Sequence, residues 1–264
     1  MKLITDKVAV VTGIGPGMGK EIALLLARHG AKLVIGARTS ATVDETAAEI
    51  RAFGGEVLTA SVDLVDQESC KAIVDLAVSA FGGVDIVVQN GAAVGDYKKV
   101  EDADLDVWRT LYEANVLSAI SLFKAALPSM KARGDGRIIL INSGAGNNRA
   151  PEGLGPYGAT KAALAGLVRS IAVEAGPHGI RCNGVHLGRI DGANFRDWVE
   201  HIAAPSYGMT PEAYMDVQFR EYLPLKTVPS AADCAGTVLF LASDLSRPVT
   251  GQAISVNGGE WFGK

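Results

Sequence analysis

Cysteine and histidine are scarce in this chain. The 264 residues include three cysteines, Cys70, Cys182 and Cys234, which lie far apart. An odd number of cysteines at wide spacing is typical of reduced thiols in the cytoplasm rather than of a disulfide framework. The four histidines are equally dispersed, so no metal site is expected.

Basic clusters and long apolar runs are also missing. The chain carries 25 lysines and arginines against 29 aspartates and glutamates, a net charge of −4, and the basic residues are scattered. We therefore expect no nucleic-acid partner. No apolar run approaches the ~18 residues that a membrane span needs, and residues 1–7 do not resemble a targeting signal. The sequence predicts a soluble, cytoplasmic protein without membrane association.

Short β-branched runs alternate with longer helical patterns along the chain. Several runs are apolar on both faces, as in a parallel sheet that helices cover on both sides. Helix starts are marked by Asp66, by Thr210 before Pro211, and by Ser230 with Asp233 three residues on. We predict one domain over residues 1–264, a Rossmann-like, doubly wound parallel sheet in a three-layer α/β/α arrangement. Its seven strands are expected at residues 8–11, 32–35, 57–60, 84–88, 137–141, 180–185 and 253–256.

The stretch VTGIGPGMGK, residues 11–20, follows the first predicted strand. A Walker-type loop does not fit, because Glu21 stands where its hydroxyl residue would be. The dinucleotide spacing G-x-G-x-x-G, begun at Gly13, would place its last glycine at Met18. The spacing that fits is Thr12-Gly13-x-x-x-Gly17-x-Gly19, a turn longer by one residue between a strand and a helix. Such a turn brings backbone amides and a helix N-terminus to a pyrophosphate, although it can also be purely structural.

A second pattern is Tyr157-Gly-Ala-Thr-Lys161. Residues at positions i and i+4 share one face of a helix, so the phenol and the ammonium can point into one cleft. Tyrosine is a poor base at neutral pH because its usual pKa is near 10, and a nearby positive charge favours the phenolate. Taken alone, such a pattern usually belongs to a solvated helix face.

Together with further motifs, these two patterns resemble the short-chain dehydrogenases/reductases. The resemblance extends over nearly the whole chain. In order, the residues that carry it are Thr12-Gly13-x-x-x-Gly17-x-Gly19, Asp63, Asn90-Gly91, Asn115, Ser143, Tyr157-x-x-x-Lys161, Ser243-Asp244, Val249-Thr250-Gly251-Gln252 and Val256-Asn257-Gly258-Gly259.

The resemblance implies a catalytic set. Tyr157 would exchange a proton with the substrate oxygen, and Ser143 would hydrogen-bond that oxygen. Lys161 would lower the tyrosine pKa and bind the nicotinamide ribose, and Asn115 would hold a water that links Lys161 to solvent. Two hydroxyl donors that converge on a carbonyl oxygen stabilise the negative charge that develops as hydride arrives.

The resemblance also implies a cofactor-binding set. It comprises Gly13, Gly15, Gly17, Met18, Gly19, Arg38, Thr39, Asp63, Leu64, Asn90, Gly91, Tyr157, Lys161, Gly188 and Ile190. At the end of the second strand, Ala37 stands where an NAD enzyme of the family usually has an acid, and Arg38 follows it. An arginine can donate two hydrogen bonds to a 2′-phosphate, so NADP(H) is favoured. NAD(H) stays possible because Arg38 can also lie along the adenine.

Three features near the predicted site leave alternatives open. His186 should lie near the nicotinamide, where it assists proton transfer or, as we favour, simply packs under the cofactor. Gly192 replaces a threonine expected to contact the cofactor, and residues 147–155 are expected to bulge around the substrate. The insertion at residues 189–229 forms a hydrophobic substrate lid, which we favour, or a small satellite core. Its candidate residues are Trp198, Tyr207, Met209, Tyr214, Met215 and Phe219.

The resemblance therefore predicts an NAD(P)-dependent oxidoreductase that transfers a hydride between a nicotinamide cofactor and a small secondary alcohol or ketone, expected to be hydrophobic or cyclic. Two alternatives are a 3-oxoacyl-carrier-protein reductase, which needs a basic docking patch, and a cofactor-sensing protein without catalysis. Lys98-Lys99 and Lys131 with Arg133 are the candidates for that patch. The family commonly forms tetramers, and residues 114–126 and 162–175 offer small apolar faces for a homotetramer.

Overall fold

The computed structural model describes residues 2–148 and 150–262, with backbone only at residues 193 and 194. Seven parallel strands form one sheet in the order β3-β2-β1-β4-β5-β6-β7. The predicted number of strands and the parallel, doubly wound sheet are confirmed. In chain order the strands are β1 (Val8–Thr12), β2 (Lys32–Ala37), β3 (Val57–Ser61), β4 (Ile86–Gln89), β5 (Gly136–Ser143), β6 (Ile180–Leu187) and β7 (Ala253–Val256).

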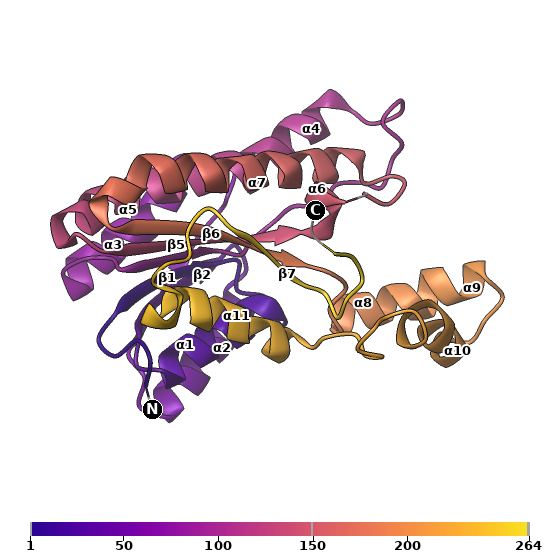
Figure 1. The fold of residues 1–264 in the computed structure, drawn as a ribbon, viewed down its shortest axis with the longest axis horizontal. Coiled ribbons are helices and arrows are strands. Elements are labelled where there is room, and N and C mark those ends of the chain that lie inside the picture. Colours follow the sequence, from indigo (N-terminus) through magenta and orange to yellow (C-terminus); the bar gives the residue numbers. More distant parts are fainter. Residues whose placement is uncertain (1, 149, 263–264) are drawn as a thin grey trace.

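Helices cover both faces of this sheet (Figure 1). One face carries α1 (Met18–Arg28), α2 (Ser40–Ala52) and α11 (Ala231–Ala242), and the other carries α3 (Gln67–Phe81), α5 (Ser118–Arg133) and α7 (Gly155–Ala175). Alternate residues of β1 pack into the hydrophobic cores on the two faces of the sheet. Ala9 and Val11 pack on the first face, and Val8 and Val10 on the second. This double burial explains the runs that are apolar on both faces.

Local signals fix where several helices begin. The Asp66 carboxylate accepts a hydrogen bond from the Glu68 N–H at 3.0 Å, and Thr210 caps α10 (Pro211–Met215). Ser230 and Asp233 form the predicted capping box at the start of α11. Each side chain satisfies backbone donors that a helix end leaves unpaired, so these predicted starts are confirmed.

Most strand boundaries differ from the predicted ones by one or two residues. Val84 lies outside β4, because the chain turns at Asp85, whose carboxylate accepts a hydrogen bond from the Val8 N–H at 2.8 Å. Strands β5 and β6 run on to Ser143 and Leu187, because the two pair in register to their carboxyl ends. Asn115 lies in a π-helical turn, Glu113–Leu117, which separates α4 (Leu105–Tyr112) from α5.

The first strand passes into α1 through a tight turn. Gly13 has φ +74°, and its N–H donates to the Gly36 carbonyl at 2.8 Å. A Cβ at Gly19 would lie 2.3 Å from the Gly13 oxygen, so a side chain there would push the helix away from the turn. The glycine spacing of the sequence therefore sets how closely α1 approaches the end of β1.

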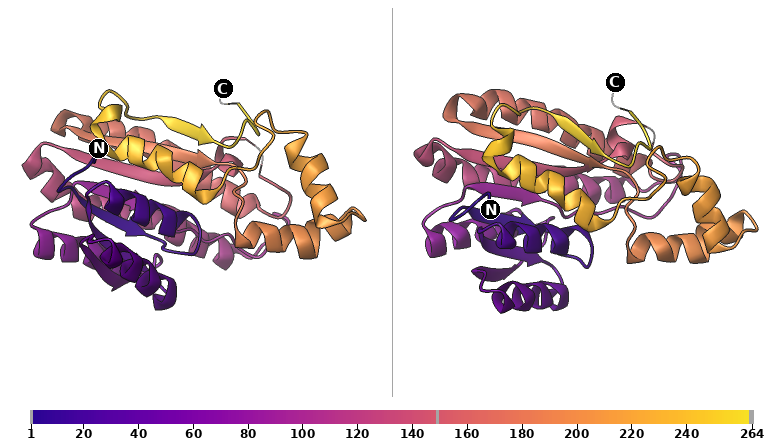
Figure 2. Two further views of the ribbon diagram at one scale, coloured as in Figure 1. Left: turned by 90° about the horizontal axis from the view of Figure 1, so that it is seen from below. Right: turned by 60° about the horizontal axis from the view of Figure 1, so that its bottom comes forward.

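The insertion after β6 lies beyond the carboxyl ends of the strands (Figure 2). It contains α8 (Ala193–Trp198), a π-helical turn at Val199–Ala203, α9 (Ala204–Ser206), α10 and a second π-helical turn at Asp216–Arg220. It has a core of its own, built from Val199, Ala203, Ala204, Tyr214, Phe219, Leu223 and Val228. Short α6 (Gly144–Asn147) follows β5 at the same end of the sheet.

None of the helices in the described residues is both long and apolar enough to cross a membrane. The three cysteines are buried and free of disulfides.

Candidate active site

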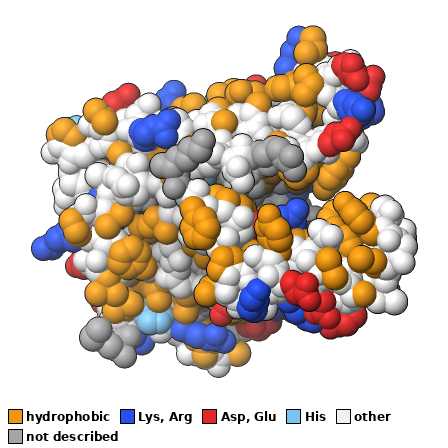
Figure 3. Space-filling model, turned by 45° about the vertical axis from the view of Figure 1, so that its right-hand side comes forward, with side chains coloured by type: hydrophobic (Ala, Val, Ile, Leu, Met, Phe, Trp, Pro, Cys, Tyr) orange, Lys and Arg blue, Asp and Glu red, His pale blue; other side chains and the backbone are white. Residues whose placement is uncertain are grey.

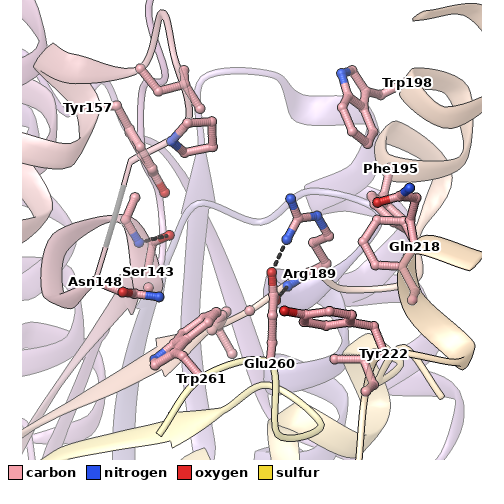
Figure 4. Close-up of a pocket in the computed structure, with 18 of the residues that line it drawn as sticks. Ser143, Asn148, Tyr157, Arg189, Phe195, Trp198, Gln218, Tyr222, Glu260 and Trp261 are labelled. Atoms are coloured by element: carbon pink, nitrogen blue, oxygen red, sulfur yellow. Dashed lines mark hydrogen bonds and ion pairs between the residues drawn. The ribbon is translucent and has the colours of Figure 1, made fainter. Parts of the chain in front are cut away.

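Hydrogen bonds tie the carboxyl end of β5 to α7. The Lys161 ammonium donates to the Ile141 carbonyl at 2.9 Å, and the Asn142 amide donates to the Lys161 carbonyl at 3.0 Å. Lys161 is fully buried, and burial lowers its pKa to about 8. Tyr157 lies one turn earlier on α7, so these hydrogen bonds between α7 and β5 hold its phenol beside Ser143 at the end of β5 (Figure 4).

The tyrosine itself departs from one expectation. Burial raises the pKa of the Tyr157 phenol, and the hydrogen bond with Ser143 acts in the opposite direction. Lys161 was expected to lower this pKa, but its ammonium is bound to the Ile141 carbonyl and lies 5.6 Å from the centroid of the tyrosine ring. In this structure the phenol therefore stays protonated at neutral pH.

Ser143 is oriented by the start of α6. Its hydroxyl oxygen accepts a hydrogen bond from the Ala145 N–H at 3.2 Å, and its own N–H donates to the Asn142 side chain at 2.8 Å. Because the oxygen accepts at this cap, the hydroxyl proton can be donated to the Tyr157 oxygen or to a ligand oxygen beside it.

Asn115 is buried within the π-helical turn, and its side chain contacts the backbone. Its amide exchanges two hydrogen bonds with Ala93, at 2.8 and 2.9 Å, and donates to the Thr160 hydroxyl at 3.0 Å. The side chain thus links the loop after β4 to the residue before Lys161. The water-holding role predicted for Asn115 stays a prediction.

A cavity of about 670 Å³ follows the glycine turn to Tyr157 and Lys161. Ten residues of the predicted cofactor set line it: Gly13, Gly15, Gly17, Met18, Gly19, Asn90, Tyr157, Lys161, Gly188 and Ile190. A Cβ at Gly15 or Gly17 would meet nothing within 4 Å, and Gly17 caps α1 without a side-chain hydrogen bond. This open cradle at a helix N-terminus fits a pyrophosphate, so the residues present fit a nicotinamide dinucleotide.

The other five predicted cofactor residues lie outside this cavity's lining. Arg38 and Thr39 are exposed where β2 leads into α2, and Asp63 and Leu64 follow β3. Gly91 instead packs against Gly13: a Cβ on Gly13 would lie 2.2 Å from it. Because β3, β2 and β1 are neighbours, all five stand at the same edge of the sheet as the glycine turn.

A second cavity, of about 840 Å³, opens on the other side of Tyr157. The insertion contributes Phe195, Trp198, Tyr214, Phe219 and Tyr222 to its walls, and Figure 3 shows apolar side chains around a hollow on this side of the molecule. Asn148, Pro151 and Leu154, from the segment expected to bulge, line it as well.

The two alternatives for the insertion, a substrate lid and a small satellite core, are therefore not exclusive. Tyr214 and Phe219 belong to its small core and also line the cavity. Met209 and Met215 pack only against the core, and Tyr207 is largely exposed. A segment with its own core can present a rigid aromatic wall to a ligand.

The sequence prediction missed the charged groups of this cavity. Arg189, just after β6, forms an ion pair with Glu260, which follows β7. Gln218 and Trp261 also line the space (Figure 4). No spacing rule could connect residues 71 positions apart; the contact exists because β6 and β7 are paired.

Comparisons with known proteins agree with this geometry. The model of the family described as enoyl-(acyl carrier protein) reductase matches residues 13–260. Dehydrogenase/reductase SDR family member 4 of Sus scrofa is 34% identical over 260 residues, which cover 98% of this chain and 88% of the relative.

Two solved structures are also similar. L-sorbose reductase from Gluconobacter frateurii, solved with NADPH and L-sorbose, has a TM-score of 0.91, 31% identity and 98% coverage of both chains. A 7α-hydroxysteroid dehydrogenase, solved with NADH and 7-oxo glycochenodeoxycholic acid, has a TM-score of 0.87 and 31% identity, and the match covers 97% of this chain and 95% of that one.

The chain belongs to the short-chain dehydrogenase/reductase family. It is an NAD(P)-dependent oxidoreductase that transfers a hydride between a nicotinamide cofactor and an alcohol or ketone.

His186 lies in β6 with no exposed surface. Neither ring nitrogen has a hydrogen-bond partner among the described residues, and burial, aided by the charge of Lys161, lowers its pKa from 6.5 to about 4. At neutral pH the ring is therefore neutral, and it lines neither cavity among the residues described. This placement supports packing over proton transfer.

The buried histidine predicts an acid-sensitive component of stability. Below pH 6.5 protons bind the unfolded chain first, so stability falls as the pH drops from 6.5 toward 4, by about 3 kcal/mol for this group. In His186→Gln the loss between pH 7 and pH 4 should be smaller by about that amount. Urea unfolding of both proteins across this range measures the difference; parallel curves would contradict the assignment.

Proposed function

We propose that the protein reduces small, predominantly cyclic ketones, and oxidises the matching secondary alcohols, at the junction of its two cavities. The observation that carries the proposal is that junction itself. Ser143, Tyr157, Leu187, Gly188 and Phe195 line both spaces. A cofactor in the glycine-lined cavity and a substrate in the aromatic cavity would meet at the two hydroxyl groups.

The residues at the junction suit proton transfer to a carbonyl oxygen. The bound cofactor supplies the hydride. The half-buried Tyr157 phenol, kept protonated by its raised pKa, donates a proton to the oxygen, and the Ser143 hydroxyl donates a hydrogen bond to it. Both interactions strengthen as negative charge develops on that oxygen. Lys161, with two donors beyond its bond to Ile141, is placed to bind the ribose hydroxyls.

A reductase acting on acyl-carrier proteins is the second candidate, because the matched family model carries that description. Its acidic partner would need free basic charge beside the cleft. Lys98 is paired with Asp96 at 2.9 Å, and Lys99 with Glu152 at 3.2 Å. Lys131 and Arg133 stand where α5 leads into β5, at the opposite end of the sheet from the site. The charge distribution therefore favours a small free substrate.

Cofactor preference and assembly belong to the same proposal. We favour NADP(H), because Arg38 is exposed at the end of β2 and no acid precedes it. We favour a homotetramer, because β7 is an edge strand with Ala253 and Ser255 exposed, and Val173 on α7 is 77% exposed. The buried, free cysteines are compatible with the reducing cytoplasm.

Tyr157→Phe tests the chemistry. Removal of the phenolic proton should lower kcat by about 100- to 10,000-fold while the dissociation constant for the cofactor changes little, since general acid catalysis is worth that much. Absorbance at 340 nm follows turnover, and cofactor fluorescence follows binding. More than about a tenth of the wild-type kcat would exclude this role for Tyr157. Absence of turnover in the wild type with every ketone would instead favour a cofactor-sensing protein.

Arg38→Ala tests the cofactor preference. A charge-assisted contact to the 2′-phosphate is worth about 1.5–3 kcal/mol, so NADPH binding should weaken by about 10- to 150-fold while NADH binding changes far less. Titration of both cofactors into both proteins provides the comparison. Equal losses for the two cofactors, or a wild-type preference for NADH, would show that Arg38 only stacks on the adenine.

The assembly is tested by mass. At micromolar concentration, light scattering should give four times the chain mass of 27.5 kDa. A monomeric mass would refute the proposed tetramer.

A further inference from the structure

The far wall of the aromatic cavity carries a pair of opposite charges. Glu260 accepts hydrogen bonds from the Arg189 guanidinium with one carboxylate oxygen and from the Arg189 backbone N–H, at 3.1 Å, with the other. Figure 4 shows the pair facing the cavity across from Tyr157 and Ser143. The side chains keep 38% and 18% of their surfaces exposed, so both present polar atoms to the space.

Aromatic rings surround this pair. The Arg189 guanidinium lies over the Phe219 ring, 5.0 Å from its centroid, and Tyr222 lies beside Glu260. Trp261 lies against Gly144, so close that a Cβ there would be 2.2 Å from the indole. The indole thereby forms a wall directly beside Ser143. A ligand ring in this cavity would meet aromatic side chains and, opposite the reacting hydroxyls, a donor and an acceptor side by side.

Three classes of ring substrate would interact differently with this wall. A hydroxyl group both donates and accepts, so several hydroxyls on one ring can bond Arg189 and Glu260 together. A carboxylate would gain from Arg189 but would meet the like charge of Glu260. A wholly apolar ring would desolvate both charged groups without forming a hydrogen bond to either of them.

We propose that Arg189 and Glu260 form a specificity site for neutral, polyhydroxylated cyclic ketones and the corresponding alcohols. The proposal rests on the proposed function, because the substrate carbonyl must reach Tyr157 and Ser143 while the ring hydroxyls reach the charged pair. The pair does not take part in proton or hydride transfer; it selects and orients the ring.

Three ketones with the same six-membered ring test the selection. They are cyclohexanone, pentahydroxycyclohexanone and 4-oxocyclohexanecarboxylate, each assayed with NADPH and with NADH. A site built to hydrogen-bond hydroxyls rejects analogues that lack them, so kcat/KM for the pentahydroxy ketone should exceed that for the other two by at least about tenfold. A preference for cyclohexanone or for the carboxylate would overturn the proposal.

Two substitutions assign the preference to the charged pair. Glu260→Gln and Arg189→Met should each lower kcat/KM for the pentahydroxy ketone at least about tenfold, mainly through KM, and change that for cyclohexanone less than about threefold. The matched control is Glu212→Gln, which removes the same charge from a second arginine–glutamate pair, Arg220–Glu212. This pair lies in the insertion and outside both cavity linings. This control should leave kcat/KM for both the pentahydroxy ketone and cyclohexanone unchanged.

The outcomes separate the two proposals. Equal losses for both ketones in the Glu260 and Arg189 variants would mean that the pair only supports the fold, and the specificity site would be refuted. Turnover of wild-type enzyme with cyclohexanone but without a gain from hydroxyls would refute the site and leave the proposed function standing. If no ketone is reduced with either cofactor, the proposed function fails and the specificity site fails with it.

Discussion

The site depends on the burial of one ammonium group. Lys161 has almost no exposed surface, and its ammonium donates a hydrogen bond to the carbonyl of Ile141 near the carboxyl end of β5. A buried charge must be hydrogen-bonded, so this contact fixes the distance between α7 and the sheet. Tyr157 on α7 and Ser143 on β5 are carried into place by the same contact. The chemistry of the site therefore rests on a bond between a helix and a strand end.

The parallel sheet supplies the second constraint. Because all seven strands run the same way, their carboxyl ends meet at one edge, where the glycine turn, the end of β5 and the insertion after β6 come together. Most side chains in the strand interiors are apolar and pack into the two cores. The candidate site therefore lies at this edge of the sheet, where the insertion adds an aromatic wall to the cavity.

Much of the fold and the core of the site could be predicted from the sequence, because the relevant signals are local. The strand runs, the caps at Asp66, Thr210 and Ser230, and the glycine spacing each depend on neighbouring residues. The π-helical turn around Asn115 was missed, because the bonds of the Asn115 side chain to Ala93 come from a distant loop. The direction of the Tyr157 pKa was missed for a similar reason: it depends on burial by several segments and not on the lysine four residues away.

The sequence by itself determined the class of chemistry. Motif order and spacing identify the glycine turn and the tyrosine–lysine helix, because backbone geometry and helical periodicity act over a few residues. Only the tertiary structure decided which groups face the aromatic cavity. Arg189 and Glu260 are 71 residues apart and meet because β6 and β7 pair. The His186 ring has no hydrogen-bond partner within the part of the chain that the structure describes, because it is buried in a strand that helices cover. Contacts of this kind depend on packing between segments, which no local pattern encodes.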